Sequence, residues 1–275
     1  MCLVLMFSQY RKLMCSQYRK DYFQQKLRFR MKLAFLVLSL VALINIDGTQ
    51  SLNTTKRYLI TINIGNAKVN KQNSVDSRKS LELIENTLCK ATPESNSKKH
   101  VKCFLKFKIV GETRVIVVVD VLDSIELESR LRSLVRSSTF RYESEPLVYY
   151  DRFARQVLGV DPALAVLKGN TLKNTPEALW CEFNINFGDK SAAEILSIWK
   201  QEAELVFQTR KSGVPTEVFK TLGERTVHVL VEIDAAAFDQ LLFGTPFNQQ
   251  IPNTLTTTCK TVVSFDNVLN PIPRG

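Results

Sequence analysis

The sequence is poor in the residues and motifs from which common metal and nucleotide sites are built. Its 275 residues contain only two histidines, His100 and His228, and no C-x-x-C pair, which argues against a zinc site. The G-x-G-x-x-G, P-loop, G-x-S-x-G and H-E-x-x-H patterns are also absent. Nucleotide binding and the common forms of hydrolysis therefore lack support, and we expect no metal ion and no cofactor.

A strong charge excess is missing from most of the chain, although the formal net charge is +10. Residues 1–50 hold eight Lys/Arg and two Asp, so the rest of the chain carries 29 Lys/Arg and 25 Asp/Glu, a net charge of +4. A charge this small does not favour contact with a phosphate backbone, and we expect no nucleic-acid partner.

A long hydrophobic run is missing too. The apolar stretch at residues 33–44 has 12 residues, whereas a membrane span needs about 20. It follows Met31-Lys32, and a basic start with a short apolar run is typical of a secretory signal peptide. We predict a signal peptide at 31–50, cleaved between Ile46 and Ser51, and a secreted protein without stable membrane association. Without cleavage the segment would be a signal anchor.

Residues 1–30 contain a near-duplicate, Met6–Lys12 and Met14–Lys20. We interpret them as a disordered N-terminal extension of the gene model, with translation starting at Met31. The alternative is a basic arm that binds nucleic acid or a membrane surface. The presumed mature chain has one N-x-S/T sequon, Asn53-Thr54-Thr55, which predicts glycosylation at Asn53.

The number of cysteines is consistent with a secreted protein. Outside the leader four cysteines remain, and an even number in an exported chain favours two disulfides. Among the three pairings we favour one bridge in each half of the chain; four buried free thiols are the alternative. The predicted bridges are Cys89–Cys103 and Cys181–Cys259.

One phrase occurs twice, as Ile109–Val119 and as Thr221–Val231. Each copy reads as the end of one strand, a tight turn at Gly-Glu, and a β-branched strand leaving it. The glycines Gly111 and Gly223 are 112 residues apart, about the size of a small domain.

Around each copy the chain alternates strand and helix in the order β-α-β-β-α-β, which is the ferredoxin-like pattern. The first pass predicts strands at 57–64, 101–121 (two strands) and 140–148, with helices at 76–90 and from 123. The second predicts strands at 180–187 and 254–263 around the hairpin, a helix that begins at the capping box Ser191-x-x-Glu194, and one at 234–244. We divide the chain into repeat 1 (51–150), a linker with a short helix (151–176) and repeat 2 (177–275).

Residues 115–119 are apolar on both faces of their strand. A two-layer domain leaves one face of its sheet exposed to solvent, so a strand that is apolar on both faces needs a second layer packed against it. We therefore predict an α+β fold in which two ferredoxin-like repeats pack sheet to sheet as an α+β barrel. The protein would be a monomeric pseudo-dimer or a homo-oligomer.

The second half resembles a known family. Residues 211–224, from Lys-Ser-Gly to the Gly-Glu turn, are similar to the helix end, strand and turn of bacterial muconolactone delta-isomerases. Glu202 matches a glutamate of that family, and Thr245-Pro246-Phe247 resembles its Leu-Pro-aromatic loop. The resemblance covers about residues 180–263, and more faintly 57–148. It implies small ferredoxin-like chains in α+β barrels that move a proton and a double bond in a lactone ring, without metal or organic cofactor.

Such chemistry requires an acid/base and donors for a developing enolate. On the predicted strand 180–187, Glu182, Asn184 and Asn186 share one face, and His228 comes from the repeated strand. Glu182 and His228 are candidate acid/base groups, and the two amides are candidate substrate-binding donors. The alternative is that Glu182 and His228 are solvated or satisfy each other.

Glu202 is a third catalytic candidate, or else a solvated helix charge. The chain departs from the family pattern at Asn184 and Asn186, where charged residues are expected, and at Trp199, where a lysine is expected. Three functions stay open: a catalytically inactive protein that holds a small molecule in the barrel cavity, an active isomerase, and an extracellular structural protein that keeps only the fold.

Overall fold

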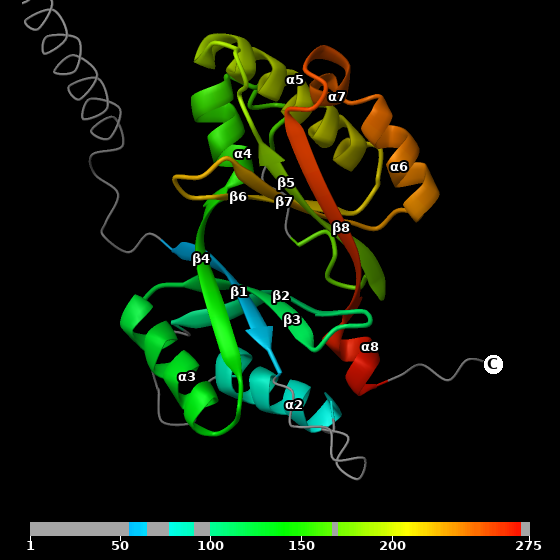
Figure 1. Ribbon diagram of the computed structural model, residues 1–275. Helices are drawn as coiled ribbons and strands as arrows, with labels where there is room; N and C mark the ends of the chain where they lie inside the picture. The colour runs from blue at the N-terminus through cyan, green and yellow to red at the C-terminus, as the bar shows by residue number, and fades with distance from the viewer. Residues whose placement is uncertain (1–54, 65–76, 91–99, 167–169, 271–275) are drawn as a thin grey trace, which may run out of the picture. The chain divides into compact units, whose positions relative to one another are not determined.

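The computed structural model describes residues 55–64, 77–90, 100–166 and 170–270 (Figure 1). The N-terminal extension, the signal peptide and Asn53 lie outside these ranges, so their interpretation stays a prediction. Residues Thr55–Gly275 belong to one compact unit. None of the helices in the described ranges is long and apolar enough to cross a membrane.

Eight antiparallel strands close into a barrel, as the two-sided apolar pattern predicted. Their order around the barrel is β1-β3-β2-β8-β5-β7-β6-β4. The fifth strand begins three residues before the predicted start, because Glu177 and Ala178 pair with the closing strand. The strands are β1 (Lys56–Asn63), β2 (Val101–Ile109), β3 (Arg114–Val121), β4 (Arg141–Tyr149), β5 (Glu177–Ile185), β6 (Thr216–Thr221), β7 (Thr226–Val231) and β8 (Leu255–Ser264).

Helices connect and cover the strands. The predicted capping box is present: Ser191 caps α5, and Glu194 bonds back to its backbone. Thr245-Pro246 begins a short helix where the resemblance suggested a loop, because proline fits the first helical position. The helical segments are α2 (Ser77–Ile84), η1 (Glu85–Cys89), α3 (Ser124–Arg136), α4 (Tyr150–Phe153), η2 (Ala154–Leu158), α5 (Ala192–Lys211), α6 (Ala235–Phe243), α7 (Pro246–Gln250) and α8 (Phe265–Leu269).

The core has an inner and an outer layer. All eight strands send apolar side chains into the barrel interior, among them Leu59, Ile116, Trp180 and Leu230. The opposite faces of β1 and β3 pack against α2, α3 and α8, and those of β5, β6 and β7 pack against α5, α6 and α7. Each strand of the repeated phrase is thus covered on both sides, and this is why it is apolar on both faces.

In each copy of the repeated hairpin, a lysine side chain donates hydrogen bonds to backbone carbonyls at the turn. Gly111 and Gly223 adopt φ angles of 76° and 78°, a left-handed conformation that glycine tolerates best. Three residues before each glycine, Lys108 donates to the carbonyls of Ile109 and Glu112 (3.2 and 3.0 Å). Lys220 likewise donates to the carbonyls of Thr221 and Glu224 (3.1 and 2.6 Å). The pattern Lys-x-x-Gly-Glu is present in both copies of the repeated segment, but we interpreted only its Gly-Glu part, as a tight turn.

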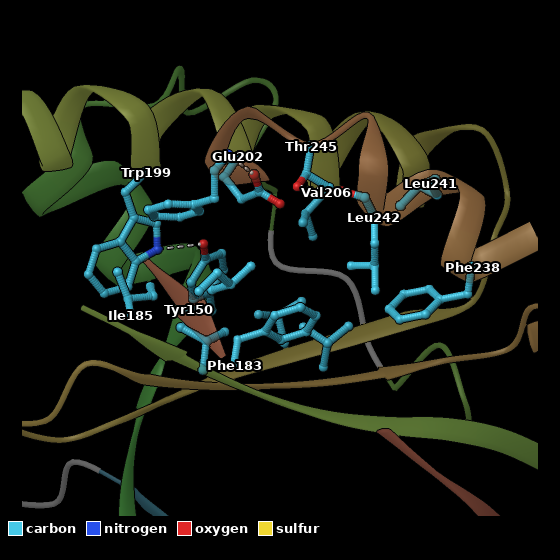
Figure 2. Close-up of a pocket in the computed structure, with 15 residues that line it drawn as sticks. Tyr150, Phe183, Ile185, Trp199, Glu202, Val206, Phe238, Leu241, Leu242 and Thr245 are labelled. Atoms are coloured by element: carbon cyan, nitrogen blue, oxygen red, sulfur yellow. Dashed lines mark hydrogen bonds between the residues drawn. The ribbon is translucent and has the colours of Figure 1, made fainter. Parts of the chain in front are cut away.

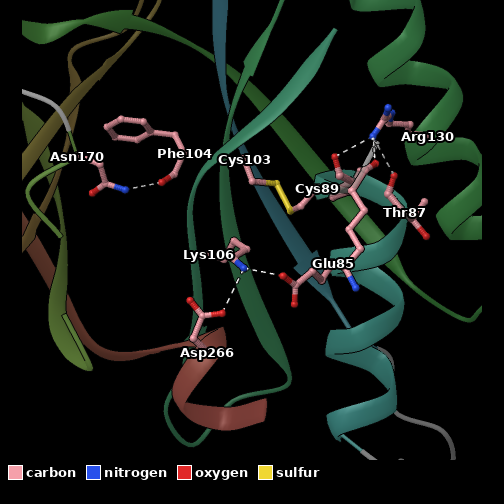
Figure 3. Close-up of a disulfide and its surroundings, with 11 residues drawn as sticks. Glu85, Thr87, Cys89, Cys103, Phe104, Lys106, Arg130, Asn170 and Asp266 are labelled. Carbon is pink, nitrogen blue, oxygen red and sulfur yellow. Dashed lines mark hydrogen bonds and ion pairs between the residues drawn. A yellow bond between two sulfur atoms is a disulfide. The ribbon is translucent and has the colours of Figure 1, made fainter. Parts of the chain in front are cut away.

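Both predicted disulfides form. Cys89 at the end of η1 is bonded to Cys103 of β2, beside the ion pair of Lys106 with Glu85 (Figure 3). Cys181 and Cys259 are opposite residues on the neighbouring strands β5 and β8. Each bridge therefore lies within one half of the chain, and neither crosses between the halves.

The two bridges should contribute unequally to stability. They close loops with sequence separations of 14 and 78 residues, and chain entropy makes the longer loop more stabilising by about 1.5 kcal/mol. Urea unfolding should therefore give a larger loss of unfolding free energy for Cys181→Ala with Cys259→Ala than for Cys89→Ala with Cys103→Ala. Equal losses in the two double variants would contradict this expectation.

Candidate functional site

A small cavity lies between the outer face of the second-half strands and the helices that cover it (Figure 2). Its volume is about 70 Å³. Aliphatic and aromatic side chains from β5, β6, β7, β8, α5 and α6 form most of its wall. Tyr150, Glu202 and Thr245 supply hydroxyl and carboxyl groups. We expected a ligand cavity inside the barrel, whereas this one lies between sheet and helices.

Glu202 is the acidic residue of the cavity wall. It sits on α5 one turn after the buried Trp199, so its carboxyl group faces the apolar interior between helix and sheet. The backbone N–H of Phe247 donates to its Oε2 atom at 3.3 Å. Burial outweighs this hydrogen bond and raises the pKa of Glu202 from 4.5 to about 7. Near neutral pH the group thus exchanges a proton easily, as an acid/base catalyst must.

Tyr150 brings a second polar atom to the cavity. It begins α4, directly after β4, and its hydroxyl oxygen accepts a hydrogen bond from Trp199 Nε1 at 3.2 Å (Figure 2). Its ring packs against Phe207 and Phe153, with centroids 6.0 and 5.9 Å away. Burial raises the pKa of Tyr150 far above its usual range, so the phenol stays neutral.

The helix α6 covers one side of the cavity. Asp234 caps it by accepting from the backbone N–H groups of Ala236 and Ala237. Phe238 is buried, and Leu241 and Leu242 turn toward the cavity (Figure 2). After the helix, the buried Thr245 donates its hydroxyl to the carbonyl of Leu242 at 2.9 Å. That hydroxyl proton is therefore already used within the protein.

Of the five residues predicted from sequence for catalysis and substrate binding, Glu202 alone belongs to this wall. Glu182 and His228 are opposite residues on β5 and β7, yet their side chains bond elsewhere. Glu182 accepts from Asn184 at 2.9 Å, and the side chain of Asn186 accepts from the backbone of Gly188. The roles of these residues remain predictions.

His228 is buried in the barrel and is held at one nitrogen. Its Nε2 atom lies 3.3 Å from Glu145 Oε2 and 3.2 Å from Thr221 Oγ1. The hydrogen bond from His228 lowers the pKa of Glu145. Within the described residues, His228 Nδ1 and Trp180 Nε1 are buried without a hydrogen-bond partner, and their rings stack with centroids 6.0 Å apart. The alternative in which Glu182 and His228 satisfy each other is not seen, because Glu145 is the carboxylate that bonds His228.

Sequence reasoning missed Tyr150 and Glu145. Tyr150 falls at the edge of the segment interpreted as a linker, where nothing marks it as part of a cavity. Glu145 lies on β4 of the first half, and it reaches His228 because β4 pairs with β6. Neither residue can be identified from the sequence without knowing that β4 pairs with β6 to close the barrel. Among the described residues, no group of three or more His, Cys, Asp or Glu could hold a metal ion.

Comparisons with known proteins give only distant structural likenesses. No family model matches the chain, and no curated protein matches it. A mutant chlorite dismutase from Candidatus Nitrospira defluvii is 11% identical, with a TM-score of 0.49 over 80% of this chain and 95% of that chain. The same enzyme in complex with imidazole is 12% identical, with a TM-score of 0.47 over 80% and 95%. Likenesses this distant carry no conclusion about activity, and the muconolactone isomerase family is not shown.

The raised pKa of Glu202 makes stability depend on pH. The folded protein keeps this proton up to about pH 7, whereas the unfolded chain releases it near 4.5. The contribution of Glu202 is therefore complete below pH 4.5 and is lost as the pH rises through 7. The loss should be about 3 kcal/mol in urea unfolding measured from pH 4 to 8.

Glu202→Gln should remove this part of the pH dependence. The matched control is Glu204→Gln, because Glu204 is on the same helix and pairs with Lys200 at 3.8 Å on its outer side. The control variant should keep the wild-type slope. An unchanged slope in Glu202→Gln would mean that Glu202 titrates normally.

Proposed function

We propose that the chain is a secreted protein of two ferredoxin-like repeats that binds a small, mostly apolar molecule in the Glu202 cavity. The observation that carries this proposal is a carboxyl group facing an apolar hollow in which little else is polar. Ligand pockets typically combine an apolar wall with a few polar groups of this kind. The cavity of about 70 Å³ restricts the ligand to a few non-hydrogen atoms, or to a somewhat larger one if α6 shifts.

The repeat interpretation is supported by strand order. In the first half the order is β4-β1-β3-β2, and in the second it is β8-β5-β7-β6, which is the same order twice. The hairpin lysines Lys108 and Lys220 also have equivalent bonds. Two copies of one ferredoxin-like unit would account for both features.

Secretion is supported by the two disulfides and by the apolar stretch after Met31. Expressed with its own leader in a secreting eukaryotic cell, the protein should appear in the medium. After enzymatic removal of the glycan predicted at Asn53, intact-mass spectrometry should give a mature start between residues 47 and 51 and a mass four hydrogens below that of the reduced, deglycosylated chain. A start upstream of Met31 would contradict the proposed leader.

A cofactor-independent isomerase is the second candidate function. The pKa of Glu202, raised to about 7 by burial, favours it, because a carboxyl group that titrates near neutral pH can take and return a proton. The third candidate, a structural protein that keeps only the fold, would not require a carboxyl group that faces a cavity.

Ligand entry is tested with a small probe, cyclopentanone. The chain has two tryptophans, and the indole N–H of Trp199 borders the cavity, so its NMR signal should shift on titration. We expect a dissociation constant on the order of 1 mM for so small a molecule. Trp199→Phe identifies which of the two indole signals is being followed.

Val206→Phe should abolish the shift, because Val206 lines the cavity and a larger side chain fills it. The control is Val135→Phe on α3, where Val135 is exposed, and it should bind the probe as the wild type does. No saturable shift in the wild type, or unchanged binding in Val206→Phe, would refute the proposed site.

A further inference from the structure

We propose that Tyr150 is the specificity residue of the cavity, donating a hydrogen bond to the carbonyl oxygen of an uncharged ligand. This inference rests on the proposed binding function and narrows it to one class of molecule. It concerns a residue outside both copies of the predicted strand-helix pattern. The argument depends on which hydrogen-bonding atoms of the cavity are already used.

The hydroxyl proton of Tyr150 is the first unused group. A phenol has one donor and two acceptor sites, and Trp199 Nε1 occupies one acceptor site. Among the described residues, no hydrogen bond has Tyr150 as the donor. Because the indole N–H fixes the oxygen from one side, the O–H must point elsewhere.

Packing holds this donor in place before any ligand arrives. Tyr150 and Trp199 are each only 3% exposed. Phe153 contacts both rings, with centroids 5.9 Å from Tyr150 and 5.1 Å from Trp199, and Phe247 packs on the indole at 6.3 Å. A donor fixed in this way loses little conformational entropy on binding. Burial also keeps the pKa of Tyr150 high, so the donor is present throughout the neutral range.

Glu202 supplies the second unused group. Phe247 donates to Oε2, and no hydrogen bond within the described residues uses Oε1. Below about pH 7 the carboxyl group is protonated and can donate a second hydrogen bond. Thr245 offers no third donor, because its proton goes to Leu242.

Two donors facing one cavity match an oxygen that can accept both hydrogen bonds, such as a carbonyl oxygen. A carboxylate ligand is disfavoured, because no Lys or Arg is among the lining residues and a buried unpaired charge is costly. The geometry thus selects ketone-like or ester-like molecules over hydrocarbons and acids.

The experiment compares cyclopentanone with methylenecyclopentane, in which a CH₂ group replaces the oxygen, at pH 6. Trp199 indole shifts should show that wild-type protein binds the ketone more tightly. Tyr150→Phe should weaken ketone binding about fivefold to tenfold, the usual effect of one hydrogen bond. It should leave hydrocarbon binding unchanged, whereas a merely structural role would weaken both probes equally.

The controls separate the two proposals. Tyr142→Phe on β4 makes the same chemical change away from the cavity and should leave both affinities as they are. If neither probe binds the wild type, the proposed binding function fails. If both bind but Tyr150→Phe leaves their affinity ratio unchanged, the function stands and the role of Tyr150 is refuted.

Discussion

The burial of both faces of β1 and β3 is the constraint on which this protein depends. The outer faces of β1 and β3 are covered by helices, but their inner faces, which carry Leu59, Ile116 and Val118, are covered only by the other half of the barrel. Either half alone would expose a sheet of aliphatic side chains, at about 25 cal/mol per Å² of apolar surface. The halves are therefore expected to fold as one unit rather than as independent domains.

Two short strand pairings close the barrel. β2 pairs with β8 from Phe107 to Ile109, and β4 pairs with β6 from Leu147 to Tyr149. Arg57 of the first half reinforces the closure, because its guanidinium group, which bonds Asp120 at 2.7 Å, lies 5.5 Å from the ring centroid of Phe219 on β6. The disulfides do not take part in closure, since each joins residues of the same half. Apolar burial and these ladders are thus what hold the two halves together.

The sequence was sufficient for features that depend on local pattern. The two-sided strand 115–119 predicted the barrel, Ser191 and Glu194 predicted the start of α5, and adjacent first and last strands predicted the Cys181–Cys259 bridge. It was insufficient where residues from distant elements meet. Periodicity says which face a side chain occupies, but the partners of that face depend on how the sheets close.

The candidate site illustrates the same limit. Glu182 and His228 occupy opposite positions on β5 and β7, a pairing that periodicity alone does not give, and His228 bonds Glu145 across the barrel closure. Glu202 was selected through a family resemblance rather than through pattern, since a half-buried glutamate on an amphipathic helix looks like any solvated charge. Nothing in the sequence marked Tyr150 as a cavity residue, because its contact with Trp199 joins α4 to α5, two separate elements.

The two halves are unequal in a way that bears on function. The faces that they turn to the barrel interior differ at equivalent positions, with Ile116 in β3 and His228 in β7. His228, however, is hydrogen-bonded to Glu145 and Thr221. The outer layers differ more. The first contains a continuous apolar cluster, with Ser80 and Arg130 as buried polar side chains, whereas the second leaves a cavity beside Glu202. Maintaining a carboxyl group there costs stability at neutral pH, a cost that a purely structural half would avoid by placing an aliphatic residue at this position. The proposed ligand would account for the glutamate in the second half, and the first half buries the inner face of the sheet that carries the cavity.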